Sequence, residues 1–202
     1  MRTKNLLLFW LSFAISVFVS TSTFASKEKS PLDTAKFMGI QLDNEFPGNV
    51  PQCPKAKVPN FPDREAVKSL PGPCFFPRPD GSFELLNGPD IGVGHVMVIS
   101  TYQEKPLKIK MAFGNKRFDK VEEIFQIKYG RAHSAYTEPL LNARGDTFSS
   151  RVRGWEGSRL RIRIDEIGDD INWGAVVVEN VTLHKVLEAD RKASSKEAAN
   201  KL

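Results

Sequence analysis

The chain has few of the residue types that usually carry out chemistry. Its 202 residues include only two cysteines and three histidines. The histidines stand at positions 95, 133 and 184, which is not a metal-ligand spacing, and neither H-E-x-x-H nor C-x-x-C is present. There is also no G-x-S-x-G nucleophile turn. We therefore predict no catalytic residue, no metal site and no cofactor, and take the protein not to be an enzyme.

One glycine-rich stretch and one acidic stretch have compositions found in binding sites, but neither fits the pattern of such a site. Gly92-Val93-Gly94 precedes a predicted strand, whereas a phosphate-binding loop opens a helix. The carboxylates Asp165-Glu166 and Asp169-Asp170 lack the further oxygen ligands and the closing Glu of a calcium loop. A solvated turn is the favoured interpretation of this acidic stretch.

Long apolar runs are also absent, apart from a short one at the N-terminus. Arg2 and Lys4 precede the run 6–19, which is apolar except for two serines, and Thr23-Phe24-Ala25 follows it. A charged start, a short apolar run and a small-x-small site are typical of a secretory signal peptide. We predict a signal peptide over residues 1–25, cleavage after Ala25 and export, most simply to the periplasm. The alternative is an uncleaved anchor, although the run is shorter than the ~20 residues of a bilayer span.

The chain that follows residue 25 is long enough for one domain with a buried core. Loss of Arg2 and Lys4 with the signal peptide lowers the formal net charge from +5 to +3. A charge this small does not by itself indicate a polyanionic partner. Outside the cytosol, nucleic acid is not an expected partner, and cleavage would leave no stable transmembrane anchor. We predict a single α+β domain over residues 26–187.

The two cysteines, Cys53 and Cys74, form an even pair in the exported part of the chain. In an oxidising compartment such a pair predicts one disulfide bond. A catalytic thiol or a metal site would need a histidine or a further cysteine nearby, and neither is present. The disulfide would fasten the segment from Pro47 to Pro79, which holds nine of the thirteen prolines and cannot form long regular elements.

The remaining chain predicts strands and helices from its periodicity. A short helix is expected over Asp33–Ile40, and a second one over Arg117–Tyr129, with Asp119 and Glu122 as a capping box and Gly130 just beyond its end. The dense apolar run His95–Tyr102 predicts a strand buried on both faces, and the alternation in Leu107–Phe113 predicts a strand with one buried face. Further strands are expected at 148–155, 160–164 and 173–183, and a charged helix or tail at 188–202.

The order of these motifs resembles a family of small exported bacterial proteins of uncharacterised function. The resemblance rests on Phe37-Met-Gly-Ile-Gln-Leu42, the two cysteines, Lys128-Tyr-Gly130 after a helix, and the late Trp155. Asp43 departs from the pattern, since such proteins often carry Gly there. The helix-then-strands order also resembles the repeats of beta-lactamase-inhibitor proteins and small outer-membrane assembly lipoproteins. It implies an α+β fold with an antiparallel sheet, a central helix and two helix-plus-strands repeats, and it implies protein binding without chemistry.

One cluster of charge stands out, on the predicted hairpin around residues 156–158. A three-residue loop would pair Val152 with Ile162 and keep one apolar face intact. The arginines would then gather on the opposite face beside Trp155; they are Arg151, Arg153, Arg159, Arg161 and Arg163. Guanidinium groups bind carboxylates and phosphates through paired hydrogen bonds, so this face is our candidate site for an anionic partner. The alternative is a solvent-facing strand whose arginines pair with acidic neighbours or lie under a helix.

Taken together, these features predict an exported cell-envelope protein that acts as a binding or accessory module. Its expected partner is another envelope protein or an anionic envelope component. Two alternatives stay open. One is a proteinaceous inhibitor of an extracellular hydrolase, which would present the crosslinked proline-rich segment as a rigid loop. The other is an enzyme acting on envelope polymers, which would need a cleft with perturbed titratable groups.

Overall fold

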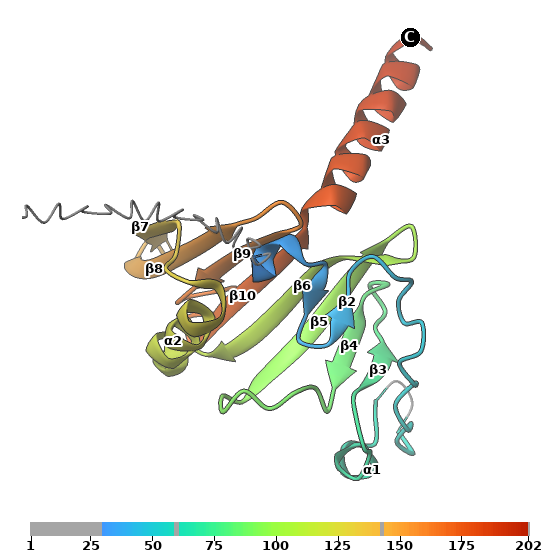
Figure 1. Ribbon diagram of the computed structural model, residues 1–202, viewed down its shortest axis with the longest axis vertical. Coiled ribbons are helices and arrows are strands. Elements are labelled where there is room, and N and C mark those ends of the chain that lie inside the picture. The colour runs from blue at the N-terminus through green and yellow to red at the C-terminus, as the bar shows by residue number, and fades with distance from the viewer. Residues whose placement is uncertain (1–29, 59–60, 142–143, 202) are drawn as a thin grey trace, which may run out of the picture.

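A single antiparallel sheet of eight strands organises the computed structural model (Figure 1). The structure describes residues 30–58, 61–141 and 144–201, so the predicted signal peptide lies outside the described residues. The strand order is β3-β4-β5-β6-β10-β9-β8-β7. The strands are β3 (Cys74–Pro77), β4 (Phe83–Leu86), β5 (His95–Tyr102), β6 (Lys105–Gly114), β7 (Ser134–Leu141), β8 (Thr147–Glu156), β9 (Leu160–Asp165) and β10 (Trp173–Asn180). The predicted α+β class is confirmed.

The sheet consists of two four-stranded meanders joined at their last strands. Strands β3 to β6 form the first meander, β7 to β10 form the second, and β6 pairs with β10 at the centre. Helix α1 (Arg64–Lys68) precedes the first meander, and α2 (Phe118–Tyr129) precedes the second. The predicted helix-then-strands order therefore occurs twice, but the first helix lies later in the chain than expected.

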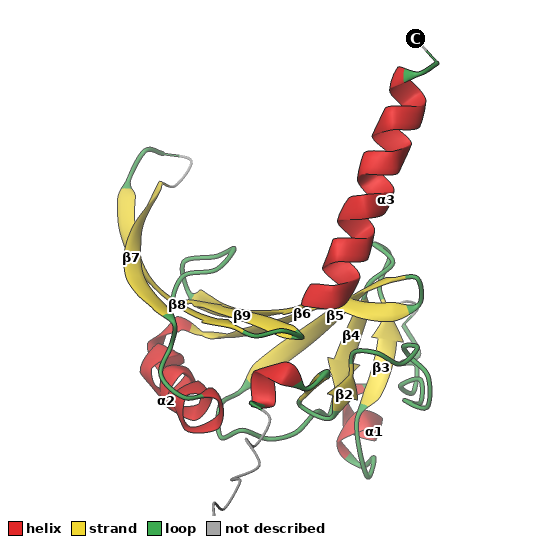
Figure 2. Cartoon of the chain, turned by 45° about the horizontal axis from the view of Figure 1, so that its top comes forward, coloured by secondary structure: helices red, strands yellow, loops and turns green. Residues whose placement is uncertain are grey.

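Alternating apolar side chains build the core on one face of this sheet. In β6 the side chains of Ile109, Met111 and Phe113 are completely buried, whereas Lys108 and Lys110 occupy the other face. The same alternation holds in β9 and β10, where the buried residues are Ile162, Ile164, Val176 and Val178. Helix α2 covers this face with Phe118, Val121 and Phe125. Figure 2 shows α2, α1 and the N-terminal elements together on this side of the sheet, which we call the helix side.

The predicted helix over Asp33–Ile40 is wrong. A 3-10 turn, η1 (Pro31–Asp33), is followed by a two-stranded hairpin, β1 (Lys36–Phe37) and β2 (Ile40–Gln41). Its turn is Met38-Gly39, and both residues have positive φ, at 46° and 87°. Such a turn matches the twist of the two strands, and glycine adopts it at no steric cost. The apolar residues of this segment are therefore buried on one side of a hairpin and not on one face of a helix.

The expectation that β5 is buried on both faces is also wrong. Met97 and Ile99 lie in the core, but Val96, on the opposite face, is 37% exposed. The apolar run alone does not distinguish a fully buried strand from one whose outer face is apolar and open.

The predicted disulfide is confirmed between Cys53 and Cys74. It holds residues 51–53 of the proline-rich segment (residues 47–79) along the outer edge of β3. Cys53 donates its N–H to the carbonyl of Phe75, and Phe75 donates to the carbonyl of Pro51, at 2.8 and 2.9 Å. These bonds occupy a sheet edge that would otherwise present unpaired backbone groups.

Helix α3 (Val181–Ala199) begins earlier than predicted and projects from the body of the protein (Figures 1 and 2). The buried side chain of Asn180 caps it by accepting a hydrogen bond from the N–H of Leu183. The same side chain donates to the carbonyl of Leu42, which ties the helix start to the N-terminal hairpin. Among the helices of the described residues, none has both the length and the apolar character needed to cross a bilayer.

Candidate binding surface

The register of β8 and β9 corrects the predicted arginine face. Trp155 lies opposite Ile162, and Val152 lies opposite Asp165 rather than Ile162. The register is therefore shifted by three residues from the one we expected. Because this shift is an odd number of residues, the two strands exchange faces relative to each other. Arg151, Arg153 and Trp155 share the helix side with the core, while Arg161 and Arg163 occupy the opposite face.

Contacts from the N-terminus set this register. The Ser158 N–H and hydroxyl both donate to the carboxylate of Asp33, and the Arg159 N–H donates to the carbonyl of Leu32. A side chain at Gly157 would collide with Leu32, so only glycine allows this approach. Arg159 itself forms an ion pair with Asp43, outside either strand face. None of these partners is adjacent in sequence to the hairpin. The alternation of residue types within the hairpin therefore predicts the wrong register.

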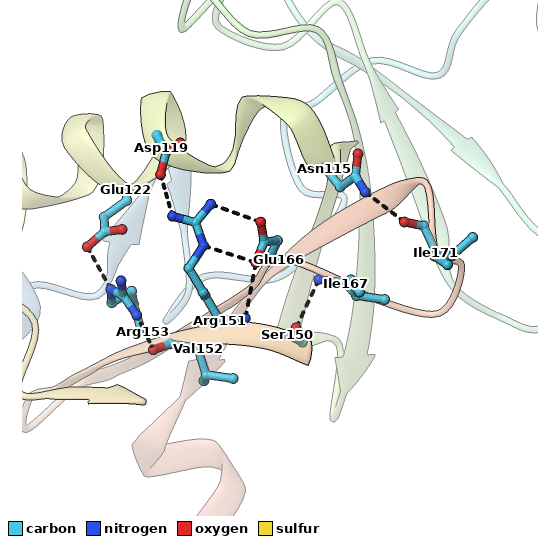
Figure 3. Close-up of polar contacts among 10 residues, drawn as sticks. All are labelled: Asn115, Asp119, Glu122, Ser150, Arg151, Val152, Arg153, Glu166, Ile167 and Ile171. Atoms are coloured by element: carbon cyan, nitrogen blue, oxygen red, sulfur yellow. Dashed lines mark hydrogen bonds and ion pairs between the residues drawn. The ribbon is translucent and has the colours of Figure 1, made fainter. Parts of the chain in front are cut away.

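On the helix side, Arg151 is enclosed by acidic partners (Figure 3). Its Nε and Nη2 donate to the two carboxylate oxygens of Glu166 at 3.0 and 2.8 Å, and its Nη1 donates to Asp119 at 2.6 Å. The guanidinium also lies over the ring of Phe118, 4.4 Å from the ring centre. The hydrogen bonds that Arg151 donates to Glu166 lower the pKa of the Glu166 carboxyl and raise the pKa of the Arg151 guanidinium.

Arg153 lies beside Arg151 and donates from Nε to Glu122 of α2 at 2.6 Å. Asp119 and Glu122 therefore fasten α2 to the sheet; the predicted capping box is wrong, because no side chain caps the start of this helix. Trp155 is completely buried and donates from Nε1 to the carbonyl of Gly130. These three sequence-predicted site residues serve the packing of α2 and are not presented to a partner.

The two arginines of the opposite face also have carboxylate partners. Arg161 pairs with Glu156 and Glu179, and Arg163 pairs with Asp165 and Glu138. The hydrogen bonds that the guanidinium groups donate to these carboxylates, chiefly from Arg163 to Asp165 and from Arg161 to Glu156, raise the pKa values of both arginines. An incoming anion would have to displace these partners. Recognition of an anionic partner here stays a prediction, and its geometry differs from that of a single arginine face.

The opposite face has a second feature, a row of mostly apolar residues that crosses six neighbouring strands. Direct cross-strand pairing gives the row Tyr136, Val152, Asp165, Ala175, Ala112 and Val96. Trp173, two residues before Ala175 on β10, flanks it on the same face. Tyr136 and Trp173 are 44% and 46% exposed, and Val96 is 37% exposed, whereas Val152 and Ala175 are buried. The accessible part of the row therefore consists mainly of the two aromatic side chains and its end on β5.

This face is also concave. Figure 2 shows the β7–β8 hairpin curling up at one end of the sheet and α3 rising on the same side at the other end. No described helix covers the sheet between them, in contrast to the helix side. We call this surface the open face. Sequence reasoning missed Tyr136 and Trp173 because strand β7 was not predicted, and because exposure on β10 depends on which face the helices cover.

Other residues whose side chains could bind metals or carry out chemistry do not lie close together in the described part of the chain. Among the described residues, no three His, Cys, Asp or Glu side chains gather as metal ligands would. His133 accepts a hydrogen bond from the N–H of Glu156. The Nε2 atom of His184 lies 3.3 Å from the Oε1 atom of Glu188, one turn further along α3. Tyr129 is buried beneath Phe125, and burial raises its pKa to about 12. Such groups fit structural positions in the fold.

Comparison with protein-family models, with curated proteins and with solved structures found no match to this chain.

Proposed function

We propose that the protein is an exported, periplasmic binding module that docks another envelope protein on its open face. The observation that carries this proposal is the concave, helix-free sheet surface with Trp173 and Tyr136 exposed on it. Aromatic residues and arginines dominate the energetics of protein interfaces because they bury a large area at little entropic cost. The small side chain of Ala112, which is half-buried, leaves room for a partner to approach the backbone closely.

The charges on the open face favour a protein partner over a simple polyanion. Lys108 and Arg161 pair with Glu179, and Lys110 pairs with Asp169, so cations and carboxylates alternate across the surface. A mixed pattern of this kind selects a partner with a complementary pattern and rejects uniformly charged polymers. An inhibitor of a hydrolase would be one special case of such docking, with the same surface as its contact.

The test compares two exposed apolar residues on opposite sides of the molecule. Trp173 lies on the open face, and Ile127, which is 78% exposed, lies on α2 on the helix side. The mature protein is used to capture partners from envelope extract, in parallel with the Trp173→Asp and Ile127→Asp variants. We expect Trp173→Asp to lose the captured protein and Ile127→Asp to retain it. Equal capture by both variants would contradict docking on the open face.

A further inference from the structure

A cavity of about 570 Å³ lies between the N-terminal hairpin and the proline-rich segment, away from the open face. Its volume is within the range of small-molecule sites, which is roughly 300–1,000 Å³. Ile40 of the hairpin, Phe46 and Val50 after it, and Leu70 after α1 contribute apolar walls. These segments are distant in sequence, so the cavity exists only in the folded chain.

The walls of the cavity are held in place before any ligand arrives. The Asn87 amide donates to the carbonyls of Leu70 and Gly72 at 3.0 and 2.9 Å, which fixes one wall. The Cys53–Cys74 disulfide joins the two stretches of chain that directly follow the two proline-containing walls of the cavity. The Phe46 ring packs edge-on against Phe83, with ring centres 5.4 Å apart. A preformed site loses less entropy on binding than a site that must be ordered by its ligand.

The chemistry of the lining points to a ligand that donates hydrogen bonds and carries positive charge. Four prolines line the cavity, at positions 47, 51, 71 and 73, and a proline has no N–H donor. The carbonyls of Pro47 and Pro51 already accept backbone hydrogen bonds, and the uncharged polar side chains of the lining are amides, which both donate and accept. No lysine or arginine lies among the lining residues, and Glu45 is the one charged side chain among them. An anionic ligand would meet the like charge of the Glu45 carboxylate, whereas an ammonium group would meet an opposite charge.

We propose that this cavity binds a small cationic amphiphile, meaning an apolar body of about eight to ten carbon atoms that ends in a protonated amine. The apolar body contacts Phe46, Val50 and Leu70, and the ammonium group lies at Glu45. The same chemistry occurs in a free alkylamine and in the amino terminus of a peptide that begins with an apolar residue. This site is independent of the open face and of the function proposed for it.

The experiment uses the mature protein and the neutral fluorescent probe N-phenyl-1-naphthylamine, which brightens in apolar cavities. Octylamine and octanoate then compete with the probe; they have equal chain length and opposite charge. We expect octylamine to displace the probe at a concentration about tenfold lower than octanoate, because a charge-assisted hydrogen bond to Glu45 is available only to the amine. A leucine amide with a free amino terminus, compared with its N-acetylated form, tests the peptide source.

Variants assign the binding to this cavity. Glu45→Gln should abolish the preference for the amine, while Glu104→Gln, a nearby carboxylate outside the lining, should leave it unchanged. Val50→Trp should fill the cavity and abolish probe binding, and Asn49→Trp, at an exposed lining position, blocks the cavity if the first variant does not fold. Ile127→Trp on α2 serves as the control. Absence of probe binding to the unmodified protein, or equal displacement by octylamine and octanoate, would overturn the proposal.

Discussion

At the residue scale, two arginines of the predicted anion-binding face instead hold elements of the fold together. Arg151 and Arg153 join α2 to β8 through carboxylates of the helix, and both lie near the ring of Phe118. A guanidinium in such a position is held by two kinds of contact, since its hydrogen bonds fix its orientation and its flat face packs on an aromatic ring. Replacing Arg153 leaves Glu122 without its counterion, whereas Arg151 has a second carboxylate partner in Glu166.

The Arg153–Glu122 pair gives the first prediction. Their side chains are only 17% and 16% exposed, so Arg153→Met leaves a largely buried carboxylate unpaired. We expect a loss of about 1–3 kcal/mol in the free energy of unfolding, measured by urea denaturation. Arg161→Met is the matched control, because its pairs are more exposed and worth at most about 1 kcal/mol. A smaller loss for Arg153→Met than for Arg161→Met would contradict the role given to the enclosed pair.

Glu166 predicts a pH dependence. Its pKa is lowered in the folded protein by the hydrogen bonds from Arg151, so the unfolded chain binds the proton more readily. The stabilisation is therefore present above the pKa of the unfolded chain, about 4.3, and is lost as the pH falls through the lower folded value. We expect Glu166→Gln to be less stable than the unmodified protein at pH 7, with the difference shrinking below about pH 4. Thermal unfolding from pH 3 to 7 measures it, with Glu123→Gln as a control on the outer surface of α2.

At the element scale, the start of α3 depends on a single buried side chain. Asn180 accepts from the Leu183 N–H with its Oδ1 and donates from Nδ2 to the carbonyls of Leu42 and Pro106. It thus joins three parts of the chain: the N-terminal hairpin, the start of β6 and the terminal helix. Further along α3, Asp190 accepts from the Tyr102 hydroxyl, and this hydrogen bond is the main cause that raises the pKa of Tyr102.

Two substitutions at this position separate its two roles. Asn180→Ala removes the helix cap and both donated hydrogen bonds, and we expect it to cost about 2–3 kcal/mol of unfolding free energy. Asn180→Asp keeps the capping oxygen but places a carboxylate against the carbonyls of Leu42 and Pro106. If capping dominates, the Asp variant is close to the unmodified protein; if the donated bonds dominate, it is at least as destabilised as Ala. Circular dichroism during urea unfolding distinguishes these outcomes, and a neutral Ala variant would show that neither role matters.

At the scale of the whole molecule, the two sides of the sheet are used differently. Helix α2 and the N-terminal hairpin complete the core on the helix side, and residues 51–53 cover the edge of β3. The open face keeps an apolar row between two raised ends. The disulfide matters to this arrangement because Cys53 and Cys74, with Val67 and Phe76, form a second, smaller apolar cluster that the main core does not include.

Removing the disulfide should therefore destabilise the whole fold. The bond closes a loop with a sequence separation of 21 residues, which corresponds to about 3 kcal/mol in the chain-entropy account. We expect the Cys53→Ala, Cys74→Ala double variant to lose about this much, or a little more because the small cluster also loses contacts. Urea unfolding gives the free energy, and a reductant should lower the stability of the unmodified protein without affecting the double variant. Identical behaviour of the two proteins in reductant and oxidant would contradict a structural role.

The sequence by itself determined the α+β class, the disulfide, helix α2 and the buried alternation in β6, because each depends on a local signal: periodicity of apolar residues, a lone cysteine pair or a terminal glycine. The faces of the arginines, by contrast, depend on the length of one turn. That turn is fixed by Asp33 and Leu32, which are more than 120 residues away in sequence. Only the tertiary structure decided that Arg151, Arg153 and Trp155 lie beneath α2, and that Tyr136 and Trp173 are exposed on the open face. A shift of one residue exchanges the faces of a whole strand, and long-range contacts alone select between the two registers.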